Sequence, residues 1–182
     1  IIVVKSTVPV GITYSVQSII KEEIVKRNKK INFDISNNPE FLKEGKAVSD
    51  FMSPDRIVIG VKHNKNNNLF KVLYNPFSLN HDKIIFMDIL SSELTKYASN
   101  AMLATKISFM NEMANISEKL GADINKVRLG IGADKRIGYS FIYPSVGYGG
   151  SCFPKDVSSI INFSKKNGYT PRILESVDIV NK

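Results

Sequence analysis

The stretch SSELTKYASNAMLATKISFMNEMANISEKLG, residues 91–121, decides how this chain is organised. A serine followed by Glu93 is typical of a helix N-terminus, and Gly121 is a natural C-terminal stop. Between them, apolar or small residues recur along one helical face, at positions 94, 97, 101, 104, 107 and 110. The pattern predicts one long helix, which opens the second half of the chain.

The residues before this helix alternate between two patterns. Short β-branched or apolar runs predict strands at residues 2–7, 33–36, 56–61 and 84–87. Helical spacing of apolar residues predicts helices at residues 12–27 and 69–76. This alternation is typical of an α/β layer with a largely parallel, Rossmann-like sheet. We therefore expect an α/β part over residues 1–90.

The residues after the long helix carry no strand pattern. Helices are predicted at residues 124–132 and 154–166, with a glycine-rich loop, residues 145–152, between them, and residues 172–182 resemble the start of another. We therefore expect an all-helical part over residues 91–182, built on the long helix.

Composition limits the class of protein. The chain has 182 residues, 43% of them hydrophobic and 23% charged, which is ordinary for a soluble globular protein. Its net charge of +8 suits a nucleic acid, a membrane surface or a small anionic substrate. The basic residues are scattered, apart from a cluster over residues 26–30 at a predicted helix end, where they favour the helix dipole. No apolar run reaches the ~18 residues that cross a bilayer. We expect neither nucleic acid nor a membrane as a partner.

The single cysteine, Cys152, lies in GYGGSCFPKD, residues 147–156. A lone thiol excludes an internal disulfide and fits a reducing cytoplasm. Glycines allow close approach of the backbone to a ligand, and Pro154 suits the first turn of a helix. Cys152 would precede that helix, where the dipole favours a thiolate, with Lys155 and Asp156 on the first turn. The pattern indicates a nucleophile; a buried structural cysteine is the alternative.

Three further groups of residues could carry chemistry. Glu40 and Glu44 are one helical turn apart, which indicates a general base or water-orienting pair, or else a solvated acidic turn. Lys96 and Asn100 have the same spacing on the long helix. A desolvated Lys96 would stabilise an oxyanion, although an exposed lysine is the favoured interpretation of this pattern alone. Thr7 ends the first strand, where its hydroxyl could contact a ligand or only cap the chain.

Histidines suggest no further site. His63 and His81 fall in polar segments, without the cysteine or acidic neighbours that metal sites require. No metal is expected.

Several motifs together resemble one family. They occur in order over about 150 residues: STVPVG (6–11), NPEFLKEG (38–45), PDRIVIG (54–60), KYASNA (96–101), residues 134–138, and GYGGSCFPKD (147–156). Together they resemble the UDP-glucose/GDP-mannose dehydrogenase family. The DRIVIG tail and Phe153 after the cysteine are similar to the UDP-glucose branch.

The resemblance implies an activity. It implies NAD-dependent, four-electron oxidation of the C6 alcohol of UDP-glucose to UDP-glucuronate, through a thiohemiacetal and a thioester on Cys152. Cofactor and substrate would be NAD and UDP-glucose. The alternatives are another nucleotide sugar, such as GDP-mannose or a UDP-N-acetylhexosamine, and an inactive module whose helices only dimerise.

The resemblance also implies roles for individual residues. Asp156 and Thr7 would act through a bound water, Lys96 and Asn100 would hold the reacting oxygen, and Glu44 would direct the hydrolytic water. The substrate would be contacted by Glu40, Phe41, Leu42, Lys43, Tyr148, Gly149, Gly150 and, across a dimer interface, Arg136. NAD would be contacted by Thr7, Glu44 and Lys155.

Two departures from the family qualify the prediction. Ser145 follows Pro144 where many bacterial relatives have glycine, which is a mild change. No G-x-G-x-x-G fingerprint for NAD occurs, and no C-terminal nucleotide-binding domain follows. We therefore expect a piece of a longer protein that is inactive alone and forms a homodimer through its helical part.

Overall fold

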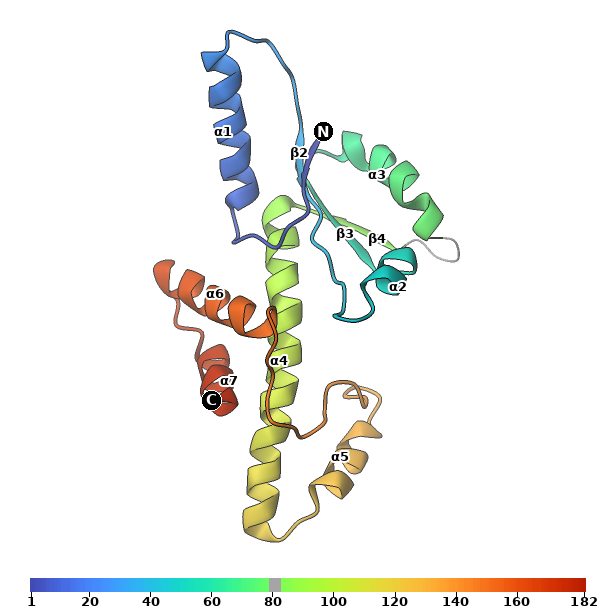
Figure 1. The fold of residues 1–182 in the computed structure, drawn as a ribbon, viewed down its shortest axis with the longest axis vertical. Helices are drawn as coiled ribbons and strands as arrows, with labels where there is room; N and C mark the ends of the chain where they lie inside the picture. Colours follow the sequence, from blue (N-terminus) through green and yellow to red (C-terminus); the bar gives the residue numbers. More distant parts are fainter. Residues whose placement is uncertain (79–82) are drawn as a thin grey trace. The chain divides into compact units, whose positions relative to one another are not determined.

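The chain folds into two compact units, residues Ile1–Lys96 and Tyr97–Lys182. The structure is a computed structural model, and it describes residues 1–78 and 83–182. His81, which the sequence places on the surface, lies outside the described residues. Each unit is described separately below, and Figure 1 labels its elements.

The first unit is built on a four-stranded sheet (Figure 1). Its strands are β1 (Ile2–Val4), β2 (Ile35–Asn37), β3 (Ile57–Val61) and β4 (Ile84–Met87), in the order β1-β2-β3-β4. The helices between them are α1 (Ile12–Lys26), α2 (Ala47–Met52) and α3 (Asn67–Tyr74), with short 3₁₀ turns at Asn64–Asn66 and Asn75–Phe77. Two strand pairs are parallel, while β2 and β3 pair antiparallel. The sheet is therefore mixed, and the α/β fold class is confirmed.

Strand β3 is the centre of this unit because both of its faces are covered. Ile57, Ile59 and Val61 pack with Phe70 and Tyr74 of α3. On the opposite face, a Cβ at Gly60 would lie 2.6 Å from the Cβ of Ser92. Only glycine therefore lets the first turn of α4 (Ile89–Leu120) approach the sheet so closely.

The long helix starts earlier than its serines suggest. Asp88 provides the cap, because its carboxylate accepts the backbone N–H of Ser91 at 2.9 Å. Ser92 is buried, and its hydroxyl instead donates a hydrogen bond to Asn37 Oδ1 at 2.7 Å. The predicted serine cap is wrong, since the side chain of Ser92 attaches the helix to the sheet.

The second unit is all helical, as predicted (Figure 1). After the remainder of α4 come α5 (Ile124–Gly132), α6 (Phe153–Lys166) and α7 (Arg172–Asn181). Gly121 has φ +71°, so the predicted stop of the long helix is confirmed. The core joins α4, α6 and α7 through five buried residues, namely Ala104, Tyr148, Val157, Ile161 and Val177. Among the described residues, no helix is long and apolar enough to cross a membrane.

Candidate active site

Asn38 anchors the segment that follows β2. Its backbone N–H donates to Val4 at 2.9 Å, and its side-chain amide donates to the carbonyl of Val58 at 2.8 Å. The residue is buried, and so is Pro39 after it. Because Asn38 bonds to both neighbouring strands, the start of the segment carrying Glu40 and Phe41 is fixed to the sheet.

Lys96 is buried next to that segment. Its side chain is only 6% exposed, and its Nζ lies 3.4 Å from Glu40 Oε1. The same Nζ is 5.4 Å from the centre of the Phe41 ring, whose face also packs against the Arg56 guanidinium at 4.0 Å. The exposed-lysine interpretation is therefore wrong. A desolvated ammonium group stabilises developing negative charge far more effectively than a solvated one.

Glu40 and Glu44 do not share a helical face. Residues 38–43 form no helix, Gly45 turns the chain with φ +78°, and α2 begins only at Ala47. Glu40 Oε2 accepts the N–H of Leu42 at 2.7 Å, which shapes a local turn, whereas Glu44 is exposed. The helical spacing used in the prediction is wrong here, because glycine breaks the pattern.

Asp50 holds the end of the same segment. It accepts the backbone N–H of Lys43 at 2.9 Å and forms an ion pair with the Lys43 ammonium at 3.4 Å. Leu42, between these contacts, is exposed. Both ends of residues 38–43 are therefore held in place, and the Leu42 side chain is exposed between them.

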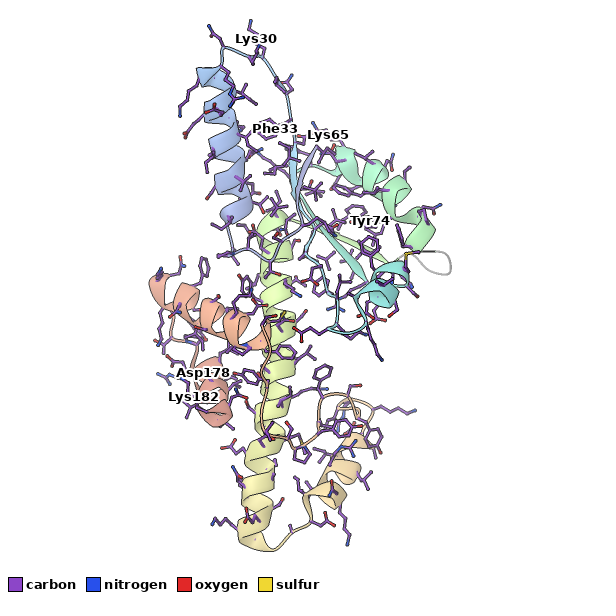
Figure 2. All side chains as sticks on the ribbon, in the orientation of Figure 1. Lys30, Phe33, Lys65, Tyr74, Asp178 and Lys182 are labelled. Carbon is purple, nitrogen blue, oxygen red and sulfur yellow. The ribbon has the colours of Figure 1, made fainter. Side chains whose placement is uncertain are left out.

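A small cavity of about 60 Å³ lies beside this segment. Its lining includes three residues that the sequence analysis did not select, Lys5, Arg56 and Tyr74. Asn38 Oδ1 accepts from Lys5 Nζ at 2.9 Å and from the hydroxyl of Tyr74, the residue labelled in Figure 2. Burial lowers the pKa of Lys5, an effect that the Glu40 carboxylate partly opposes, and burial raises the pKa of Tyr74. The position of Lys5 at the carboxyl end of β1 is the signal that could have identified it.

Thr7 lies half-buried between β1 and α1, beside a helix start that is already occupied. Gly11 has φ +96° and offers no side-chain cap. Instead, the buried carboxylate of Glu93 accepts the N–H groups of Gly11 at 2.6 Å and Thr13 at 2.9 Å. A dinucleotide pyrophosphate would need such N–H groups, so it does not fit at α1.

In the second unit, Cys152 stands at the start of α6. It is the residue immediately before Phe153, its side chain is exposed, and its carbonyl accepts the N–H of Asp156 at 2.9 Å. Its sulfur lies 3.6 Å from the Ser151 hydroxyl. The predicted position at a helix N-terminus is confirmed, and the buried-cysteine alternative is wrong.

Asp156 accepts hydrogen bonds from two polar side chains near the start of α6. Its carboxylate is 2% exposed and accepts from Asn100 Nδ2 at 2.6 Å and from Lys155 Nζ at 2.6 Å. The Lys155 side chain is 57% exposed, and its bond to Asp156 raises its pKa. Asn100 of α4 therefore forms one hydrogen-bonded cluster with Lys155 and Asp156, which lie on the first turn of α6 after Cys152.

The glycine-rich loop presents backbone next to that cluster. The ring of Tyr148 is buried and meets Phe153 edge-on at 6.2 Å. Gly149 and Gly150 are exposed, and Gly150 has φ +73°. The loop thus exposes peptide groups rather than side chains immediately before Cys152.

Arg136 makes a local ion pair. Its guanidinium contacts Asp134 at 2.5 Å, and these bonds lower the pKa of Asp134. The Arg136 side chain is otherwise exposed. The local salt bridge that competed with a cross-subunit role is present, and the cross-subunit role stays a prediction. No cluster of potential metal ligands occurs in residues 1–78 and 83–182.

Comparison with known proteins identifies the class. Residues 1–78 match the NAD binding domain of the UDP-glucose/GDP-mannose dehydrogenase family, and residues 90–182 match its central domain. These are domains of NAD-dependent nucleotide-sugar dehydrogenases. The chain belongs to the UDP-glucose/GDP-mannose dehydrogenase family.

Individual relatives agree with this assignment. The UDP-glucose 6-dehydrogenase of Pseudomonas aeruginosa is 49% identical over all of this chain, and TuaD of Bacillus subtilis, also a UDP-glucose 6-dehydrogenase, is 45% identical. A solved UDP-glucose dehydrogenase from Pyrobaculum islandicum superposes with a TM-score of 0.88 at 39% identity, covering 98% of this chain and 40% of that one. This chain spans 40% of the Pseudomonas relative and 38% of TuaD.

Proposed function

We propose that the chain forms the catalytic core of a UDP-glucose 6-dehydrogenase that works through a covalent bond to Cys152. The observation that carries the proposal is the placement of Cys152 one helical turn from the Asn100–Asp156–Lys155 cluster. A nucleophile and a buried carboxylate lie at the start of α6, and Asn100 of α4 and Lys155 donate to that carboxylate. This is the set that aldehyde oxidation through a thioester needs. The relatives at 45–49% identity favour UDP-glucose as the substrate.

The proposal divides the chain by task. Residues 1–90 form the C-terminal part of an NAD-binding domain, and residues 91–182 form the central domain that carries the cysteine loop. NAD, when bound, accepts a hydride in each of the two oxidations. Thr7, Glu44 and Lys155 contact the cofactor, although the start of α1 does not hold its pyrophosphate because Glu93 occupies it.

In the first oxidation, the chain removes a proton from the C6 hydroxyl. Asp156 accepts this proton through a bound water that the Thr7 hydroxyl helps to orient, and Lys96 stabilises the alkoxide. The burial of Lys96 supports this role, since its charge faces little competing water. The product of the step is the C6 aldehyde.

Cys152 then adds to the aldehyde carbon. The new C–S bond converts the carbonyl into a thiohemiacetal, whose oxygen is held by Lys96 and Asn100. Asn100 uses one N–H for Asp156, so its amide has a second N–H to donate. The second oxidation produces a thioester.

Water completes the reaction by attacking the thioester carbon. Glu44 orients this water and takes a proton from it, the C–S bond breaks, and the thiolate of Cys152 is restored with release of the carboxylate. Glu40, Phe41, Leu42 and Lys43 contact the nucleotide sugar, together with Tyr148, Gly149 and Gly150. The exposure of Leu42, Lys43, Gly149 and Gly150 supports this assignment.

The decisive variant is Cys152→Ser, with Ser151→Ala as the matched neighbour. Both variants are made in the full-length enzyme, where NADH and UDP-glucuronate are measured from UDP-glucose and NAD⁺, with GDP-mannose and a UDP-N-acetylhexosamine as competing substrates. Cys152→Ser is expected to form no uronic acid, because an oxygen ester is much harder to form and hydrolyse here, while Ser151→Ala stays active. Near-normal uronic acid from Cys152→Ser would rule out the covalent mechanism, and preference for another sugar would reassign the substrate.

We also propose that the protein is a cytoplasmic homodimer joined through α4, with Arg136 reaching the substrate of the partner subunit. Met102, Phe109 and Ile116 on α4 are exposed apolar residues, which a second copy would cover. Mixing an Arg136→Ala subunit with a Cys152→Ala subunit tests the proposal. Mixed dimers regain activity if sites are shared, since one of the two sites is then intact; mixed dimers without activity would place Arg136 in its own subunit's site.

A further inference from the structure

Asn181, the last residue of α7, bonds twice to the backbone of Tyr148. The Tyr148 N–H donates to Asn181 Oδ1 at 2.7 Å, and Asn181 Nδ2 donates to the Tyr148 carbonyl at 3.0 Å. A carboxamide offers one acceptor and one donor side by side, so a single orientation satisfies both groups. The Asn181 side chain therefore bonds to both backbone groups of Tyr148, as a neighbouring β-strand would.

Both partners of this double bond are themselves held in place. The ring of Tyr148 is buried with Ala104, Val157 and Val177. Helix α7 is tied to α4 where the Ser108 hydroxyl donates to the Val177 carbonyl at 2.9 Å. The position of Asn181 is therefore fixed by its neighbours, and the end of α7 is not frayed.

The loop also passes tightly against Asn181 one residue earlier. Gly147 has φ +107°, and a Cβ there would lie 2.7 Å from Asn181 Oδ1. From Tyr148 the chain reaches Cys152 across only Gly149, Gly150 and Ser151. Two glycines in three residues restrict the backbone little, so this short link needs a fixed end.

We infer that Asn181 is a positioning residue for Cys152. It fixes the Tyr148 backbone at one end of the link, while the first turn of α6 fixes Cys152 at the other end. The inference rests on the proposed function for the role of Cys152. The double hydrogen bond itself can be measured without any catalysis.

Three variants separate this role from general support of the helix. Asn181→Ala removes both bonds, whereas Asn181→Asp keeps the acceptor for the Tyr148 N–H at neutral pH and loses the donor. Ser176→Ala is the matched control, because its hydroxyl bonds to Arg172 within α7. Should Asn181→Ala fail to fold, Asn181→Asp still tests the inference.

Hydrogen exchange tests whether Asn181 fixes the backbone of Tyr148. The Tyr148 amide is expected to exchange about tenfold faster in Asn181→Ala, at an intermediate rate in Asn181→Asp, and at the parent rate in Ser176→Ala. Amides of residues 173–178 should keep their parent rates in all three. Unchanged exchange at Tyr148 in Asn181→Ala, or equal loosening throughout α7, would overturn the inference.

Alkylation by iodoacetamide tests whether the fixed loop positions Cys152, and it also needs no substrate. Its rate is expected to change at least about threefold in Asn181→Ala and less in Asn181→Asp, because the thiol is no longer held in one place. An unchanged rate despite a loosened Tyr148 would overturn the positioning role. Failure of the full-length enzyme to oxidise UDP-glucose would count against the proposed function alone, since neither measurement requires turnover.

Discussion

The two units each pair a buried charge with a more exposed one, but with opposite signs. In the first unit the buried member is the Lys96 ammonium, next to the half-exposed Glu40. In the second it is the Asp156 carboxylate, next to the exposed Lys155. In both, the buried group is the one to which the proposed chemistry assigns a task, and the exposed partner balances its charge.

The second contact of each buried group shows how burial is tolerated. A buried charge destabilises a protein unless neighbouring groups compensate it. Lys96 has the Phe41 ring beside Glu40, and Asp156 has the Asn100 amide beside Lys155. A cation is thus supported by a π face and an anion by an N–H donor, which are the groups suited to each sign.

Replacing Lys96 should produce the largest effect on this comparison. Lys96→Ala is expected to lower kcat by a factor of order 10² or more with little change in KM, because the alkoxide loses its stabilising charge. Lys96→Met keeps the apolar stem and should be equally slow. A large loss of melting temperature in Lys96→Met, with kcat preserved in the folded fraction, would make Lys96 a purely structural residue.

Asp156 should matter most for stability. Asp156→Ala is expected to lower the free energy of unfolding by about 2–3 kcal/mol in urea titrations, since Asn100 and Lys155 lose their shared partner. Asp156→Asn should cost less because it keeps an acceptor.

The control for Asp156 is a more exposed pair at the end of α7. Asp178 and Lys182 are 2.8 Å apart, and their side chains are 33% and 74% exposed (Figure 2). Asp178→Asn is expected to cost less than about 1 kcal/mol. Equal losses in Asp156→Ala and Asp178→Asn would mean that burial of the carboxylate is unimportant.

Lys155 should give the smallest effect, one that is present at neutral pH and disappears at alkaline pH. Its bond to Asp156 raises its pKa above the ordinary 10.5, so the folded state keeps the proton longer than the unfolded state. The contribution is therefore complete below pH 10.5 and is lost as pH rises through the folded pKa. Because Lys155 is exposed, removing it should change the melting temperature by only about 1 °C.

The measurement compares melting temperatures of the parent and Lys155→Met from pH 8 upward. Tyr74 and Tyr148, whose pKa values burial raises, also destabilise the fold at alkaline pH in both proteins. The difference between the two curves is therefore the relevant quantity. A difference that grows with pH instead of shrinking would contradict the ion pair.

Local patterns predicted what depends on local structure. The helices were anticipated closely, and Cys152 was placed at a helix start, because spacing, proline and glycine act over a few residues. α2 was missed, since six residues without a strong apolar face give little signal. Even so, spacing misled for Glu40 and Glu44, where Gly45 turns the chain.

Burial of Lys96 and the role of Asn181 could not be predicted in this way. Lys96 is covered by Phe41, 55 positions earlier in the sequence, and Asn181 bonds 33 residues back to Tyr148. Both depend on tertiary packing, which helical periodicity does not encode. The chemical roles of the residues came from the family resemblance rather than from spacing.

The close contact between Gly60 and Ser92 sets the rotational phase of α4. A helix advances about 100° per residue, so a slip of one position would swing every side chain through a quarter turn or more. Such a slip is blocked because the backbone of Ile89 and the side chain of Ser92 rest directly on Gly60. Lys96 follows Ser92 by four residues and therefore points within about 40° of the same direction. Because Gly60 of β3 has no Cβ, α4 packs on the sheet in this rotation, and the rotation sets the direction of the Lys96 side chain.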